Sequence, residues 1–171
     1  MKHSTLILAA IAALCLTACN RSGGNTEADK ATAEAVDQQL ADLGTYESEG
    51  QNYIKAQLKQ DPALKQTKSG LVYKITNPGS GPQFKATDVV MVKYVGSHTN
   101  GQIFDDGGGQ AVPFNLGQVV PGFREMILMM RPGAEAHCIM PPGIAYGEQG
   151  NQAIAPNETL VFDIKTLEVE Q

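Results

Sequence analysis

The chain has 171 residues, with 13 basic and 18 acidic side chains and three cysteines. A formal net charge of −5 disfavours a nucleic-acid-binding protein, because such proteins carry clustered basic residues. Once an N-terminal processing segment is set aside, the remaining length suits one compact domain with an appendage.

The first 18 residues are typical of a bacterial signal peptide. A basic start precedes an apolar run from Leu6 to Leu16, which is too short to span a bilayer stably. Leu16-Thr-Ala-Cys19 resembles a bacterial lipobox, in which the signal is cut before the cysteine and the new N-terminal cysteine is acylated. We therefore predict a signal peptide over residues 1–18, and a lipidated Cys19 with its tether over residues 19–26. The alternative is a plain secretory signal with a chance cysteine.

Asn20 follows the predicted lipidated cysteine. An aspartate there is the usual inner-membrane retention signal in sorting of the enterobacterial type, so its absence favours the outer membrane. We expect the protein on the periplasmic side of the cell envelope, which is an oxidising compartment. Cys15 leaves with the signal and Cys19 would carry lipid, so Cys138 is left as a single thiol without an intramolecular disulfide partner. Its apolar, strand-like surroundings predict a buried structural cysteine.

Residues 27–67 are predicted to form a helical N-terminal segment. Apolar side chains recur at helical spacing over residues 27–43, and Gly44 is expected to end this first helix. A second helix is expected over residues 46–60, before Asp61-Pro62, because proline biases the preceding residue away from the helical conformation. Both helices carry few large apolar side chains, so they would fray, pack on the following domain or pair with a second copy as a homodimer.

From Gly70 onwards, short alternating segments are punctuated by Gly, Pro and Asn, which is typical of an antiparallel sheet. The expected strands cover residues 71–75, 88–98, 103–105, 112–116, 135–140 and 159–169. Thr99-Asn-Gly101 predicts a type I′ hairpin turn, since Asn-Gly tolerates the positive φ angles of that turn.

Pro121 opens the one convincing helix of this half of the sequence. Four apolar side chains share the helix face that should lie on the sheet: Phe123, Met126, Ile127 and Met130. The predicted fold is α+β, a twisted antiparallel β-sheet half-barrel wrapped on one short α-helix and preceded by N-terminal helices.

Five motifs occur in order in this region: Val92-Lys-Tyr-Val-Gly96, Gly101-Gln-Ile-Phe-Asp105, Val119-Val-Pro-Gly-Phe123, Met140-Pro-Pro-Gly-Ile-Ala-Tyr-Gly147 and Thr159-Leu-Val-Phe-Asp-Ile164. Together they resemble the FKBP-type peptidyl-prolyl isomerases, which implies an isomerase domain over residues 68–171. Any domain of this size needs large apolar side chains for its core, so each aromatic residue taken alone has a structural explanation. The order of the five motifs is what favours the family.

The resemblance implies that aromatic side chains in or beside these motifs line a shallow hydrophobic pocket for the proline ring of a peptide. Those aromatic residues are Tyr94, Phe104, Phe114, Phe123, Tyr146 and Phe162. Nine residues receive a role in this pocket: Tyr94, Phe104, Asp105, Val119, Val120, Phe123, Tyr146, Ile154 and Phe162.

The implied roles divide the pocket into floor, walls, edge and rim. Phe123 would form the floor, and the walls would be Tyr94, Phe104 and Phe162. Val119 and Val120 would form an edge at which the Val120 backbone could pair with the peptide. Ile154 would lie in a flap over residues 147–156.

Two polar residues are implied at the rim. Tyr146 would sit at a loop edge, because the prolines and glycines around it serve neither a helix nor a strand. Asp105 has two interpretations: an acceptor that organises nearby tyrosine and arginine side chains, or an ordinary turn residue beside a triple glycine.

The implied activity is cis/trans isomerisation of Xaa-Pro bonds in unfolded or partly folded proteins outside the cytoplasm. The amide loses resonance as it twists over a barrier of roughly 18–20 kcal/mol. An apolar pocket would favour the twisted state over the charge-separated planar one, and a hydrogen bond from Tyr146 could add differential binding. No covalent nucleophile, metal or cofactor is required. The alternative is a peptide-binding chaperone that kept the pocket and lost most of its catalysis.

The resemblance is incomplete at three places. Phe123 stands where the family's floor is usually tryptophan, and Val112 where another wall aromatic is common. The flap over residues 150–157 is about one residue shorter than usual and reads Ala153-Ile-Ala-Pro156. These departures predict a looser pocket, with modest activity or a shift towards larger residues before proline, and they bear more on macrolide binding than on isomerisation.

Other functional motifs are not found. His98 and His137 have no partner at metal-ligand spacing, so they are expected to be ordinary strand or surface histidines. Residues 105–109 lack the alternating acids and distal glutamate of a calcium loop, and the glycines are not followed by the Lys-Ser/Thr of a phosphate loop. No Ser-His-Asp grouping favours a hydrolase.

Overall fold

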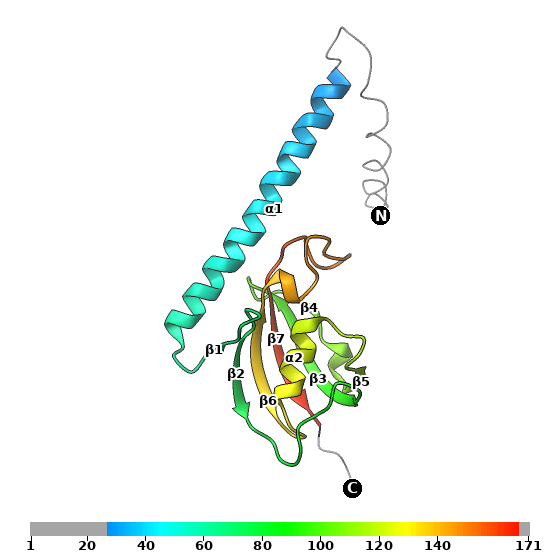
Figure 1. Ribbon diagram of the computed structural model, residues 1–171. Helices are drawn as coiled ribbons and strands as arrows, with labels where there is room; N and C mark the ends of the chain where they lie inside the picture. The colour runs from blue at the N-terminus through cyan, green and yellow to red at the C-terminus, as the bar shows by residue number, and fades with distance from the viewer. Residues whose placement is uncertain (1–26, 168–171) are drawn as a thin grey trace. The chain divides into compact units, whose positions relative to one another are not determined.

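The computed structural model describes residues 27–167 of the chain (Figure 1). The predicted signal peptide, lipidated cysteine and tether over residues 1–26 lie outside this range. The described residues fall into two units, which divide between Gln38 and Gln39. Among the residues described, no helix is both long and apolar enough to cross a membrane.

Seven strands form one antiparallel sheet: β1 (Lys65–Gln66), β2 (Val72–Asn77), β3 (Val89–His98), β4 (Ile103–Asp105), β5 (Val112–Asn115), β6 (Glu135–Met140) and β7 (Leu160–Thr166). The strand order is β1-β2-β6-β7-β3-β4, and β5 also pairs with β3. Two short 3₁₀ turns, η1 (Gly107–Gly109) and η2 (Pro142–Ile144), lie between strands. The sheet wraps on the helix α2 (Pro121–Met129), so the predicted α+β half-barrel is confirmed (Figure 1).

All six expected strands are present, with ends that differ by a few residues from the expectation. The two-residue strand β1 was not predicted, because so short a strand has no alternation to detect. The last residues expected in β7, from position 168, lie outside the described range, although the Leu167 N–H still bonds the Met91 carbonyl at 2.9 Å.

The hairpin between β3 and β4 is not the predicted type I′ turn. Gly101 has a positive φ of 86°, but Asn100 does not. The His98 N–H donates to the Gln102 carbonyl and the Gly101 N–H to the His98 carbonyl, both at 2.9 Å. The loop therefore has three residues and ends in a left-handed glycine, which is a common alternative when one residue is added to the turn.

The main core lies between the sheet and α2. Phe123, Met126 and Ile127 are buried on the predicted face of α2, and Met130, just after the helix, is also buried. They pack with Leu71, just before β2, and with side chains from the sheet, among them Val92, Cys138, Leu160 and Ile164. Cys138 is a buried free thiol, as expected, and burial raises the pKa of that thiol.

One continuous helix, α1 (Glu27–Gln60), replaces the two helices that the sequence predicts. Gly44 lies inside α1 and does not end it. A glycine within a helix costs about 1 kcal/mol relative to alanine, but it does not prevent the helical conformation. The predicted end before Asp61-Pro62 is correct, and the Asp61 carboxylate accepts the Ala63 N–H there at 2.9 Å.

The last turns of α1 pack on the sheet face opposite α2. Ile54 is buried in a second apolar cluster whose other buried members are Leu64, Val72, Ile139 and Val161. Gly50 is also buried, and a Cβ added to it would lie 2.1 Å from the Thr159 Oγ1 atom. The sequence leaves three outcomes open for this segment: fraying, packing on the following domain, or pairing with a second copy. The C-terminal part of α1 packs on the domain.

This contact predicts opposite effects for two glycines of the same helix. Gly50→Ala should lower the free energy of unfolding by about 1–3 kcal/mol, because the new methyl group would collide with Thr159. Gly44→Ala should raise it by about 0.5–1 kcal/mol through helix propensity, because no atom lies within 4 Å of an added Cβ. Urea unfolding followed by circular dichroism measures both. Equal changes in the two variants would contradict the docking of α1.

Candidate functional site

A cavity of about 270 Å³ opens between the sheet and the start of α2. Strands β3, β4, β5 and β7, the segment leading into α2 and the loop after η2 all contribute to it. The lining residues are Tyr94, Phe104, Asp105, Phe114, Gln118, Val119, Val120, Phe123, Tyr146 and Phe162. Six of these ten side chains are aromatic, so the cavity is suited to an apolar ring.

Phe123 lies at the centre of the aromatic side chains. Its ring centroid is 5.0 Å from that of Phe114, 5.7 Å from Phe162 and 6.1 Å from Tyr94. The last two pairs are edge-to-face, a favoured geometry for aromatic rings. Phe123 is only 4% exposed, so it closes the cavity from below.

Gly96 in β3 makes room for two of the walls. The rings of Phe104 and Phe162 meet edge-to-face with centroids 5.7 Å apart. A Cβ added to Gly96 would lie 2.7 Å from the Phe104 ring and 2.8 Å from the Phe162 ring. Real Cβ atoms do not approach other atoms so closely, so any larger residue would push the two rings apart.

Asp105 connects the rim to the wall. Its Oδ2 atom accepts a hydrogen bond from the Tyr94 hydroxyl at 2.5 Å, and its Oδ1 atom accepts the Gly107 N–H at 3.1 Å. The bond to Tyr94 fits the interpretation of Asp105 as an acceptor that organises a tyrosine, and the bond to Gly107 fits the interpretation as a turn residue. No arginine takes part, because none of the ion pairs in the described part of the chain includes Asp105.

The two tyrosines of the cavity remain protonated well above neutral pH. Burial, then the hydrogen bond to Asp105 and the charge of that carboxylate, raise the pKa of Tyr94. Burial, followed by the charge of Asp105, also raises the pKa of Tyr146. The Tyr146 side chain is 37% exposed, and its hydroxyl has no hydrogen-bond partner within residues 27–167. It can therefore donate to a bound peptide.

The loop from Pro141 to Gly147 holds Tyr146 in place. The Pro142 carbonyl accepts the N–H groups of Ala145 at 3.0 Å and Gly147 at 2.9 Å. Gly147 has a φ of 62°, in the region that favours glycine. The side chain and carbonyl of Ile144 lie against Gly122, where an added Cβ would come within 3.0 Å of both. The loop is therefore fixed to the first turn of α2.

The segment that enters α2 offers a backbone donor. The Val120 carbonyl accepts the Arg124 N–H at 3.1 Å as the first bond of the helix. The Val120 N–H, in contrast, has no acceptor in the described part of the chain. Val120 lines the edge of the cavity, where the resemblance implies that its backbone pairs with a peptide.

The structure brings eight of the nine predicted site residues to one cavity and leaves Ile154 out. Ile154 is 3% exposed and packs in the main core. The Asn151 side chain accepts the N–H groups of Ala153 at 2.8 Å and Ile154 at 2.9 Å within the same loop. Phe114 lines the cavity, where the resemblance places it among the six aromatic side chains without a particular role. Gln118 also lines the cavity, and it gives no signal in the sequence beyond its position beside Val119.

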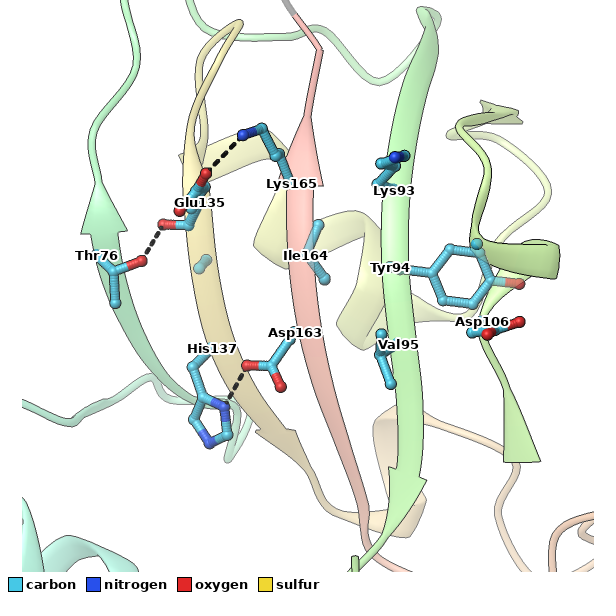
Figure 2. A pocket seen from close by; sticks show the side chains of 12 residues that line it. Thr76, Lys93, Tyr94, Val95, Asp106, Glu135, His137, Asp163, Ile164 and Lys165 are labelled. Carbon is cyan, nitrogen blue, oxygen red and sulfur yellow. Dashed lines mark hydrogen bonds and ion pairs between the residues drawn. The ribbon is translucent and has the colours of Figure 1, made fainter. Parts of the chain in front are cut away.

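A second, open groove of about 340 Å³ lies on the opposite face of the sheet (Figure 2). Apart from Tyr94, no predicted site residue lines it. Charged pairs cross the strands there: His137 Nδ1 lies 2.7 Å from Asp163 Oδ1, and Lys165 donates to Glu135 at 2.7 Å. Within the described range, no three His, Cys, Asp or Glu side chains lie close enough to hold a metal ion.

Comparison with known proteins agrees with this geometry. Residues 81–167 match the family model described as FKBP-type peptidyl-prolyl cis-trans isomerase. A probable FKBP-type peptidyl-prolyl cis-trans isomerase of Haemophilus influenzae is 39% identical over 83% of this chain and 57% of its own length. The crystal structure of FkpA from Escherichia coli has a TM-score of 0.73 and 28% identity, covering 87% of this chain and 75% of that one. A peptidyl-prolyl cis-trans isomerase from Pseudomonas syringae has a TM-score of 0.67 and 31% identity, covering 75% and 96%. The chain spans about half the length of the curated relatives it matches.

Removing the charge at the rim tests the electrostatics of the cavity. Asp105→Asn should lower the pKa of Tyr94 and of Tyr146 towards the ordinary value for tyrosine, because a negative charge that disfavours tyrosinate is lost. Asp106→Asn is the matched control. It should affect Tyr94 much less, since Asp106 makes the smallest contribution to that shift. Alkaline titration of ¹³C-labelled tyrosine rings by NMR reports each pKa. Unchanged tyrosines in Asp105→Asn would contradict this arrangement.

Proposed function

Since this chain belongs to the FKBP-type peptidyl-prolyl cis-trans isomerase family, we propose that it catalyses cis/trans isomerisation of Xaa-Pro bonds in unfolded or partly folded proteins. One observation carries the proposal: six aromatic side chains surround a cavity of about 270 Å³ beside a tyrosine hydroxyl that is free to donate. An apolar ring of the size of proline suits such a lining, and the polar groups at its edge suit a peptide backbone.

Binding would orient the peptide for rotation about the imide bond. The proline ring would rest on Phe123, between the rings of Tyr94, Phe104 and Phe162. The unpaired N–H of Val120 would donate to a peptide carbonyl at the cavity edge. With the proline ring held, only the carbonyl of the preceding residue still has to turn. Binding therefore lowers the entropic part of the barrier by fixing the orientation of the peptide.

The lining also acts on the electronic state of the imide. A planar amide is charge-separated, and water stabilises it through that charge. Transfer into an aromatic cavity removes this stabilisation, so the planar state rises in free energy relative to the twisted one. A hydrogen bond from Tyr146 that strengthens in the twisted state would bind the transition state more tightly than the ground state. These steps involve neutral groups of the chain itself.

Loss of the Tyr146 hydroxyl should slow catalysis. Tyr146→Phe should lower kcat/KM by about five- to tenfold, the equivalent of one hydrogen bond of about 1 kcal/mol made in the transition state. Phe123→Leu should also lower kcat/KM, because a smaller floor holds the proline ring less firmly. Tyr73→Phe is the matched control, since Tyr73 packs on the core without lining the cavity. Rates are measured on a series of Xaa-Pro peptides.

Two outcomes of this assay would count against the proposal. If the wild-type protein accelerates no Xaa-Pro peptide while peptide binding is intact, the chain is a peptide-binding chaperone module rather than an enzyme. The phenylalanine floor in place of the family's usual tryptophan makes that the relevant alternative. Unchanged rates in both Tyr146→Phe and Phe123→Leu would instead reject this cavity as the site.

We also propose that the chain acts on the periplasmic side of the cell envelope, anchored by a lipid on Cys19 and directed to the outer membrane. The sequence Leu16-Thr-Ala-Cys19 and the following Asn20 support this location. Pairing of two copies would involve α1, on which Val36 and Tyr46 are exposed large apolar side chains. Lipid and helix would then hold the isomerase domain near its clients.

The anchor has a direct test. Cys19→Ser protein should move from the membrane fraction to the soluble periplasmic fraction, because the acylated thiol is lost. Fractionation followed by immunoblotting measures the distribution, and Cys138→Ser serves as the control that keeps the anchor. Cys19→Ser protein that stays with the membranes would contradict lipidation.

A further inference from the structure

One ion pair in the described part of the chain is far more shielded than the others. His98 Nδ1 lies 2.5 Å from Glu158 Oε1, and the two side chains are 18% and 9% exposed. The side chains of the other three pairs are all at least 30% exposed. The sequence marks His98 as an ordinary strand histidine, because its partner is 60 positions away.

His98 supports a wall of the cavity from behind. Its imidazole ring packs edge-to-face on Phe104, with centroids 5.3 Å apart and an interplanar angle of 63°. Phe104 in turn lines the cavity and contacts Phe162. His98 itself does not line the cavity, so it would act on a bound peptide through Phe104.

Glu158 also bonds the loop that follows Tyr146, so it connects His98 with that loop. Its second oxygen, Oε2, accepts the Ala155 N–H at 2.8 Å. The Asn157 N–H bonds the Gly147 carbonyl at 2.9 Å, and the Tyr146 carbonyl accepts the Gly150 N–H at 3.2 Å. A single carboxylate thus joins the end of β3, the back of the Phe104 wall and the 147–157 loop.

The pair is a strong and shielded contact. Hydrogen bonds to a carboxylate are charge-assisted and about twice as strong as neutral ones. Because both side chains are largely shielded from water, removing one of them would leave the other without a partner in a shielded place. Among the described residues, Glu158 is the side-chain hydrogen-bond partner of His98, and Phe104 is the aromatic contact of its ring.

On the premise of the isomerase activity above, we propose that His98 and Glu158 are positioning residues for the cavity. The pair holds the Phe104 wall and the 147–157 loop in the position that receives the proline ring. The effect falls mainly on KM, since the pair touches no reacting atom.

Separate measurement of KM and kcat on an Xaa-Pro peptide tests this role. His98→Ala should raise KM by about threefold or more with kcat little changed, because the Phe104 wall loses its support and Glu158 its partner. His98→Gln keeps a side-chain donor for Glu158, so it should recover part of the wild-type KM. His137→Ala is the matched control: His137 pairs with Asp163 through the same nitrogen on the opposite face, and this variant should keep the wild-type KM.

A KM that is the same in His98→Ala and wild type, or a loss confined to kcat, overturns the proposal. If His98→Ala does not fold by circular dichroism, Glu158→Gln replaces it with the same expectation, because it removes the carboxylate that accepts from His98. NMR keeps this test apart from failure of the isomerase activity. Even without catalysis, the signals of the Phe104 ring and the Ala155 amide should shift in His98→Ala and not in His137→Ala, and signals that do not shift overturn the proposal.

Discussion

The absence of a side chain at Gly96 is the constraint on which the cavity depends. The rings of Phe104 and Phe162 come from different strands and meet over the backbone of β3 at that position. β3 pairs with β4, β5 and β7, and each of these strands sends one aromatic ring to the cavity. Phe123 on α2 then packs against the ring from β7, which joins helix and sheet at the same point. The packing that shapes the site is therefore shared between the helix and the sheet.

The sequence predicts most of this arrangement because local patterns determine it. Alternation gives β4 and β6 their observed bounds, and proline gives the start of α2 and the end of α1. The order of five motifs assigns eight of the ten residues that line the cavity. Phe114 is expected in the lining without a particular role, and Gln118 carries no local mark of its position there.

The differences between prediction and structure have more than one physical origin. Gly44 costs helical stability, yet the continuous helix α1 forms through it, because one glycine does not prevent the helical conformation. Ile154 lies in the expected flap and packs in the main core, and its local sequence does not show that burial. The pairing of His98 with Glu158 spans 60 positions, and neither residue shows it in its own neighbourhood. The burial and the pairing depend on the assembled fold.

The distribution of tyrosine has a practical consequence for following the molecule at work. The chain contains no tryptophan and five tyrosines, of which Tyr94 and Tyr146 line the cavity. Its ultraviolet emission therefore comes mainly from tyrosine, and two of the five tyrosine rings stand in the cavity itself. A tryptophan-bearing client could be excited separately, and its arrival would quench these two rings by energy transfer. The protein thus carries an intrinsic optical label at the site of occupancy.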